Sequence, residues 1–281
     1  MTASVQTAPV EVPAAVPAKA ARVRRPVGRL GRRVPFARAV GPLVLLAVWW
    51  VASAAGWLDP QTLASPSDVA TTTGDLIAGG ELQKHLLVSL QRAALGLAFG
   101  VSAGVLLALA AGLSRVGEAL LDGTLQLLRS LPILALVPLA ILWFGIGEEV
   151  KVILVALGTL FPVYINTHAA LTGLDVRYAE LAQTLGLSRT AFLRRIVLPG
   201  AAPGFFTGLR ISVTVSWLVL VVSEQINASS GIGYLMTQAR TFARTDVIVV
   251  GLVVYGVLGL ASDTLVRLVE RRVLAWRTTL G

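Results

Sequence analysis

Arg92 and Glu224 are the side chains best placed for chemistry in this sequence, because each charge lies inside a long apolar stretch. Removing a charge from water is costly, so such residues usually pair with one another or serve a transport pathway. Both interpretations stay open. The two residues form an ion pair between packed helices, or Arg92 attracts an anionic solute from outside while Glu224 orients the guanidinium.

Other reactive chemistry is not supported by the residue pattern. The chain has no cysteine, and its two histidines, His85 and His168, lie too far apart in the sequence to indicate a metal site. No serine–histidine–aspartate arrangement and no pair of acids at mid-membrane depth is visible. We therefore predict no catalytic residue, no metal site and no cofactor bound by this chain. The segment 228–236 has too few glycines for a phosphate-binding loop and is expected to form an outer loop or a re-entrant turn.

The composition places the chain in a lipid bilayer. Of its 281 residues, 55% are hydrophobic and 14% are charged, and the mean hydropathy of +0.77 exceeds what a soluble domain can bury. The net charge of +9 does not indicate nucleic-acid binding, because the basic residues cluster in the N-terminal tail and at the ends of apolar segments.

Six apolar runs are long enough to cross a hydrocarbon core, which takes about 20 helical residues. We predict an all-α polytopic membrane protein with spans near 39–58, 87–113, 122–146, 150–171, 204–226 and 247–266. Pro132 and Pro138 should kink the third span. Small residues recur every four positions in the second span and indicate close contact with another helix of the same chain; they are Gly96, Gly100, Gly104 and Ala108.

The distribution of basic residues sets the expected orientation. With both termini inside, 17 of the 24 lysines and arginines fall on the cytoplasmic side, and only Lys84, Lys151, Arg240 and Arg244 fall outside. The expected organisation is a disordered cytoplasmic tail (1–38), a first transmembrane helix (39–58), an external segment with a short helix near 67–78 (59–84), the membrane core (85–270) and a cytoplasmic tail (271–281).

The stretch 175–203 is a polar island between two apolar runs, and its pattern indicates two short helices joined by a hinge. Asp175 and Ser188 can cap the two helices, and Gly186 can end the first in a left-handed conformation. Pro199 should end the second helix.

The second of these helices is amphipathic. Phe192 and Ile196 lie one turn apart on its apolar face, and Arg189 lies on the opposite face. A basic helix pair of this kind can simply lie on the membrane surface. The spacing across the whole loop argues for a more specific role.

The loop resembles the EAA loop of ABC importer permeases, whose pattern is E-A-A-x3-G-x9-I-x-L-P. The matching residues are Glu180, Leu181, Ala182, Gly186, Ile196, Leu198 and Pro199. Leu181 departs from the pattern, because it replaces the middle alanine, and the contact at that point should be bulkier than usual. The resemblance extends from about 65 to 277, is nearest to the nitrate/sulfonate/taurine branch, and within it to aliphatic sulfonate permeases.

This resemblance implies the type I ABC importer permease fold, in which the two short helices are coupling helices that dock into cytoplasmic ATPase subunits. Arg189 and Phe192 are then part of the coupling surface together with the motif residues. The implied partners are the ATPase subunits, which use the ATP, an extracytoplasmic solute-binding protein, a second copy of the permease and the lipid of the cell membrane. The chain itself is expected to be a multi-pass transport subunit and not an enzyme.

The expected solutes are aliphatic sulfonates, with nitrate, taurine or another small solute as alternatives within the same family. A secondary carrier is a more remote alternative, because the middle thirds of the spans carry almost no ionisable residue that could couple transport to a proton or sodium ion. A membrane-bound enzyme is disfavoured because no catalytic arrangement is visible.

Overall fold

The computed structural model describes residues 37–276, and every regular element in that part of the chain is a helix. The chain divides into two units, Met1–Leu46 and Ala47–Gly281. The expected tail 1–38 and the end of the tail 271–281 lie largely outside the described residues. The first described helix, α1 (Ala37–Ala54), leaves most of its large apolar side chains exposed, as expected of a helix surrounded by lipid.

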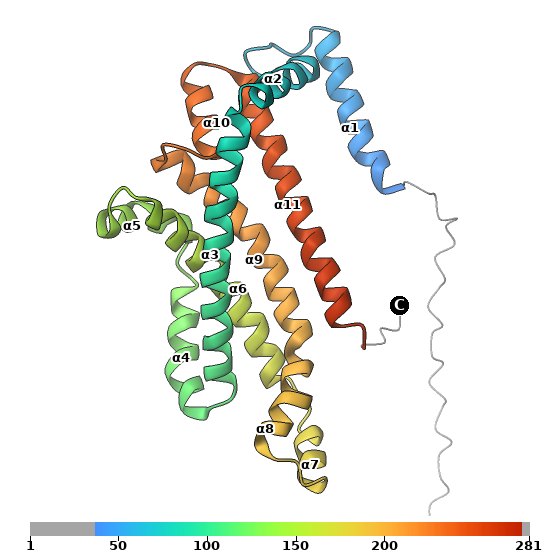
Figure 1. Cartoon of the computed structure of the whole chain (residues 1–281), viewed down its shortest axis with the longest axis vertical. Coiled ribbons are helices and arrows are strands. Elements are labelled where there is room, and N and C mark those ends of the chain that lie inside the picture. Colours follow the sequence, from blue (N-terminus) through green and yellow to red (C-terminus); the bar gives the residue numbers. More distant parts are fainter. Residues whose placement is uncertain (1–36, 277–281) are drawn as a thin grey trace, which may run out of the picture. The chain divides into compact units, whose positions relative to one another are not determined.

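Three long helices form the centre of the larger unit (Figure 1). They are α3 (Glu81–Gly112), α6 (Glu148–Thr172) and α9 (Leu198–Asn227), and α6 packs against both of the others. The small-residue row of the second span lies at the α3–α6 contact, as predicted. A Cβ atom at Gly100 would collide with Thr159 Oγ1 and Ala156 O, and one at Gly104 would lie 2.7 Å from Leu160 O.

A second row of glycines, on α9, also lies against α6. A Cβ atom at Gly208 would lie 2.7 Å from Pro162 O, and one at Gly204 would overlap the Ala170 side chain. Within the same buried contact, the Ser212 hydroxyl of α9 donates a hydrogen bond to Thr159 O at 2.7 Å. Because the backbones of α3 and α9 both approach α6 this closely, and α3 also contacts α9, the three helices form one tightly packed central layer.

Two further helices complete this unit beside the central layer. The helices α10 (Ile232–Thr241) and α11 (Thr245–Val273) pack against each other and against α9. The short helix α2 (Pro66–Ala78), expected near 67–78, packs against α11, and Ser65 caps it by accepting from Asp68 N.

The third predicted span is broken and not merely kinked. It consists of α4 (Arg115–Leu128), the short 3-10 helix η1 (Ile133–Leu136) and α5 (Val137–Phe144), and the two halves meet at an angle of 82°. Pro132 and Pro138 flank η1, and neither can donate a backbone hydrogen bond that would carry one helix into the next.

The all-α polytopic fold class is confirmed. Four helices of the described region are long and apolar enough to cross a membrane, or five if the bent pair crosses as one span. The first expected span corresponds to α1, whose apolar part Val40–Ala54 is shorter than expected for a full crossing. The expected core 85–270 corresponds to helices that begin at Glu81 and end at Val273.

The loop 175–203 forms α7 (Arg177–Thr184), α8 (Arg189–Phe192) and the π-helical segment η2 (Leu193–Val197), which runs directly into α9. The expectation that Pro199 ends the second helix is therefore wrong. Leu198 N–H donates to Leu193 O in the wider π pattern. Pro199 then falls in the first turn of α9, where a missing donor costs little.

The close approach of α3 to α6 can be tested with two matched substitutions. Gly100→Ala should lower the free energy of unfolding by about 1–3 kcal/mol, because the added methyl overpacks the α3–α6 contact. Gly123→Ala adds the same methyl to an exposed position of α4 with no atom within 4 Å, and should be neutral or slightly stabilising.

Thermal unfolding of the purified protein in one detergent measures both variants. Helix propensity changes in the same direction in the two, so the difference between them reports the packing alone. Equal melting temperatures for the two variants would contradict the close α3–α6 contact.

Candidate functional site

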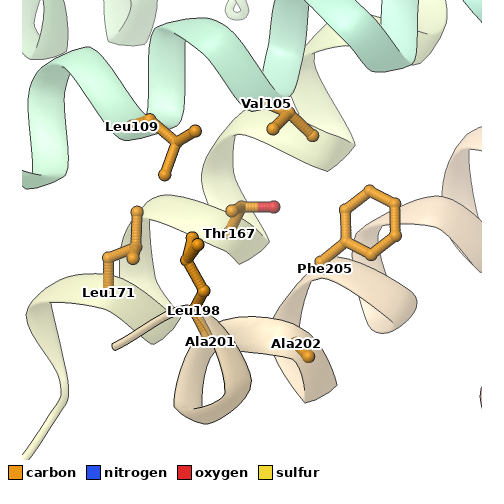
Figure 2. A pocket seen from close by; sticks show the side chains of 8 residues that line it. All are labelled: Val105, Leu109, Thr167, Leu171, Leu198, Ala201, Ala202 and Phe205. Atoms are coloured by element: carbon orange, nitrogen blue, oxygen red, sulfur yellow. The ribbon is translucent and has the colours of Figure 1, made fainter. Parts of the chain in front are cut away.

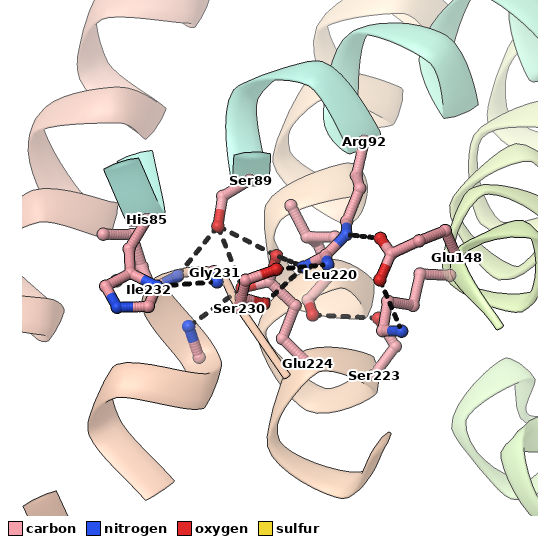
Figure 3. Close-up of polar contacts among 12 residues, drawn as sticks. His85, Ser89, Arg92, Glu148, Leu220, Ser223, Glu224, Ser230, Gly231 and Ile232 are labelled. Carbon is pink, nitrogen blue, oxygen red and sulfur yellow. Dashed lines mark hydrogen bonds and ion pairs between the residues drawn. The ribbon is translucent and has the colours of Figure 1, made fainter. Parts of the chain in front are cut away.

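The structure brings Arg92 and Glu224 together in a buried ion pair (Figure 3). Arg92 lies on α3 and Glu224 on α9, and the Arg92 Nη1 to Glu224 Oε1 distance is 2.6 Å. The two side chains are 3% and 0% exposed. Burial of both charges is tolerable because each is paired and hydrogen-bonded.

Glu224 also occupies the N-terminus of α10. Its carboxylate accepts from Gly233 N at 2.9 Å, from Ser89 Oγ at 2.8 Å and from Tyr255 Oη at 3.0 Å. Helix N-termini attract anions because their backbone N–H groups lack partners within the helix. Here the carboxylate of another helix provides that anion, so one side chain joins α9 to α3, α10 and α11.

Two glycines of the segment 228–236 make this arrangement possible. A Cβ atom at Gly231 would collide with the Glu224 carboxyl group, and one at Gly233 would lie 2.7 Å from Glu224 Cβ. Ser89 Oγ additionally accepts from Ile232 N at 2.9 Å, and His85 Nδ1 accepts from Gly231 N at 3.0 Å. Residues 228–231 therefore form a short turn around a carboxylate, whereas 232–236, which were expected in the same loop or turn, are the start of α10.

The remaining donors of Arg92 are directed at protein groups. Nε donates to Glu148 of α6, Nη1 also donates to Ser230 O at 2.7 Å, and Nη2 donates to Ser230 Oγ at 3.2 Å. The side chain of Lys151, which is 3% exposed, lies 3.4 Å from Glu148 Oε1. In this conformation the guanidinium holds helices together, and contact with a solute would require these bonds to open.

The first half of the loop 175–203 has the geometry of a well-capped helix. Gly186 has a φ of +63°, as expected for the left-handed residue that ends α7. Gly186 N–H donates to Gln183 O and Leu187 N–H donates to Ala182 O, which is the Schellman pattern. Asp175 Oδ1 accepts from Arg177 N at 2.9 Å, but the N-cap position of α7 is Val176, so the expectation that Asp175 caps this helix is wrong by one residue.

The predicted coupling residues divide between an exposed and a packed set. Ala182 is buried, whereas Glu180, Leu181, Gly186 and Arg189 are exposed. Leu181 is 50% exposed, and Val176 and Leu185 of the same loop are 69% and 64% exposed.

The second half of the loop is anchored to the central layer. Ser188 caps α8 by accepting from Ala191 N at 3.3 Å. Phe192 packs on the buried cluster of Leu171, Val197 and Ala201. Of the other coupling residues in this half, Ile196 and Pro199 are half-buried and Leu198 is 41% exposed. A force on the exposed loop would therefore reach α6 and α9 through packed side chains.

A separate apolar pocket of about 260 Å³ lies between α3, α6 and α9 (Figure 2). Seven of its eight lining side chains are apolar, and the eighth is Thr167 of α6. Thr167 is buried, and its hydroxyl has no hydrogen-bond partner among the described residues. The pocket carries no charge, so it offers little recognition for an anion.

Several residues of the Glu224 network were not identified from the sequence. Ser89, Ser230 and Tyr255 are ordinary residues of membrane helices and turns, and no local spacing connects them to Glu224. Glu148 was not singled out because it lies at a helix end, where acids are common. No group of three or more potential metal-ligating residues lies together in the described part of the chain.

Comparison with known proteins identifies the family of this chain. Residues 100–275 match the family model described as "Binding-protein-dependent transport system inner membrane component". The chain is 48% identical to the "Putative aliphatic sulfonates transport permease protein SsuC" of Escherichia coli strain K12, over 84% of this chain and 89% of that protein. It is 36% identical to the "Taurine transport system permease protein TauC" of the same strain, over 88% and 94% of the two chains.

The fold is also similar to a solved structure of an amino acid ABC transporter crystallised with histidines. The TM-score is 0.57 at 20% sequence identity, and the match covers 72% of this chain and 96% of the other. At this identity the similarity extends to the fold alone.

The Glu224 network can be tested by removing its charge. Glu224→Gln removes one of the two carboxylates that pair with buried Arg92, and breaking a buried pair costs up to about 3–5 kcal/mol. Glu149→Gln removes a charge from an exposed position at the start of α6 and should change stability by less than about 0.5 kcal/mol. Denaturant unfolding in detergent measures both. Unfolding of Glu224→Gln at the same midpoint as the parent would show that the pair does not stabilise the fold.

Proposed function

This chain belongs to the family of binding-protein-dependent transport system inner membrane components, and we propose that it is the membrane-spanning permease subunit of an ATP-dependent importer of aliphatic sulfonates. The observation that carries the proposal is the coupling loop with its left-handed Gly186 between α7 and α8. The sulfonate assignment is supported by the higher identity to the aliphatic sulfonates permease (48%) than to the taurine permease (36%).

The energy for transport comes from a separate ATPase in this proposal, so the chain is not an enzyme. The exposed residues of α7 and α8 form the surface that contacts the ATPase; they are Glu180, Leu181, Gly186 and Arg189. Closure of the ATPase subunits on ATP moves this surface, and Phe192, Ile196 and Pro199 transmit the movement to α6 and α9. The result is an exchange between inward-open and outward-open states.

The other proposed partners are an extracytoplasmic solute-binding protein, which delivers the sulfonate, and a second copy of the permease. The N- and C-termini lie in the cytoplasm, since 17 of the 24 basic residues then lie on that side. A reporter fused to the C-terminus should behave as cytoplasmic and one inserted at Gly74 as external. The reverse pattern would contradict this orientation.

The role of Arg92 and Glu224 in the translocation pathway stays a prediction. On the proposed orientation their network lies at the outer ends of α3 and α9, where a delivered anion first meets the permease. When the outer ends separate, the hydrogen bonds of Arg92 become available to the sulfonate. Unchanged sulfonate uptake by a folded Arg92→Ala variant would show that Arg92 is not part of the translocation pathway.

The coupling role of the loop predicts a specific phenotype for Gly186→Val. Gly186 has no neighbouring atom within 4 Å, so a larger side chain meets no steric obstacle, but its positive φ costs a β-branched residue about 1–2 kcal/mol. The variant should reach the membrane in normal amounts and retain less ATPase on copurification. Gly186→Asn is the matched control, because asparagine tolerates the left-handed conformation. Full transport by Gly186→Val would show that the hinge is not needed for coupling.

The substrate assignment predicts a growth phenotype. A deletion strain should fail to grow with an alkanesulfonate as the only sulfur source and should grow normally on sulfate. Mid-membrane segments with little charge allow an anion to cross, but they do not distinguish one anion from another. Normal growth on alkanesulfonates, together with loss of growth on taurine or nitrate, would show that the family assignment is right and the substrate assignment is wrong.

A further inference from the structure

A groove of about 910 Å³ lies beside the coupling loop, at the ends of the spanning helices. Its walls come from the end of α6, from α7, from η2 with the first turns of α9, and from Trp276 just after α11. Pockets that hold small organic ligands have volumes of about 300–1,000 Å³, so the groove is large enough for one. Three of the proposed coupling residues, Leu181, Ile196 and Pro199, lie in its lining, but the proposed transport cycle assigns no ligand to it.

The groove combines one guanidinium with aromatic and apolar walls. Arg195 lines it and makes no salt bridge or side-chain hydrogen bond within residues 37–276. Trp276 and Tyr178 supply the aromatic surface, and Leu174 and Pro203 supply apolar surface. No acidic residue lines the groove. This set of side chains favours a ligand with an anionic head and an apolar tail.

Two glycines shape the floor of the groove. A Cβ atom at Gly200 would lie 2.7 Å from Leu174 Cδ2, and one at Gly204 would overlap the side chain of Ala170. Since neither position has room for a side chain, α9 lies close to the end of α6 along this wall of the groove.

We infer that this groove is a binding site for an alkanesulfonate on the cytoplasmic side, where the imported product accumulates. The inference rests on the proposed function, because that function supplies the ligand and the side of the membrane. The sulfonate head pairs with Arg195, and the alkyl chain lies against Trp276 and the apolar wall. A sulfate ion would use the guanidinium alone and would leave that wall empty.

Binding in the groove has a consequence for coupling. The ligand contacts α7, which belongs to the coupling surface, and also α6, α9 and the end of α11. It therefore stabilises one position of the coupling loop relative to the spanning helices, and a ligand that favours one state opposes the exchange between states. Product in the cytoplasm should slow ATP hydrolysis by the complete transporter.

The test uses the complete transporter in lipid vesicles, with the binding protein and pentanesulfonate enclosed and the ATPase subunits facing outward. ATP is added outside, and the stimulated ATPase rate is measured against pentanesulfonate added outside. Inhibition is expected for the parent, and sulfate should inhibit more weakly. Arg195→Gln should raise the half-inhibitory concentration about tenfold, which is the loss of one charge-assisted contact. Trp276→Ala should also raise it.

Arg194→Gln is the matched control, because Arg194 is the neighbouring exposed arginine and does not line the groove. It should keep the inhibition of the parent. Equal inhibition of Arg194→Gln and Arg195→Gln would show that the groove is not the site. A loss of copurifying ATPase in Arg195→Gln would identify the groove as an ATPase contact and overturn the inference.

The failure of this inference can be told apart from failure of the proposed function. If enclosed pentanesulfonate stimulates ATP hydrolysis but added pentanesulfonate does not inhibit, the groove inference is wrong and the transport function stands. If pentanesulfonate with the binding protein gives no stimulation, the proposed function is wrong. If removal of anionic lipid changes the ATPase rate of the parent without added pentanesulfonate, and Arg195→Gln abolishes that change, the groove holds a lipid headgroup and not the sulfonate.

Discussion

The close approach of both α3 and α9 to α6 is the constraint on which the rest of this structure depends. Gly100 and Gly208 leave room only for backbone, and buried hydroxyls such as Ser212 use the short distance to reach backbone carbonyls of α6. In a bilayer, helix association depends on this kind of packing, because lipid is as apolar as the helix surface. The layer fixes where both ends of the three helices lie, and the polar regions of the molecule are built at those ends.

The two ends use their polar groups in opposite ways. At one end, Glu224 accepts from α3, α10 and α11, and Arg92 extends the network to Glu148 of α6. Each buried charge there is paired, so separating the helices at that end means breaking several charge-assisted bonds at once. At the other end, α7 exposes Leu181 and makes no extensive contact with another helix of the described region. One end therefore resists separation, whereas the other presents a surface that a partner can move.

The sequence predicted features that depend on neighbouring residues and missed those that depend on distant ones. The Schellman ending at Gly186, the cap at Ser188 and the contact row at Gly96–Gly104 follow from local spacing and were anticipated. The partners of Glu224 lie on three other helices, and no spacing in the sequence indicates that a carboxylate of α9 will occupy the N-terminus of α10. The sequence predicts a helix end at Pro199. The shift to π-type bonding in η2 makes a proline harmless there, and this shift has no residue signature of its own. The second glycine row on α9 is visible in the sequence, because Gly204 and Gly208 lie four residues apart.

The central claim is that this subunit has no energy source of its own and is driven through its coupling loop. Uptake of labelled pentanesulfonate into lipid vesicles tests it most directly, with the permease alone compared with the permease, the ATPase subunits, the binding protein and ATP. The account predicts accumulation only in the complete system, and none when a non-hydrolysable nucleotide replaces ATP. Accumulation by the permease alone, driven by a proton or sodium gradient, would contradict the account and identify a secondary carrier.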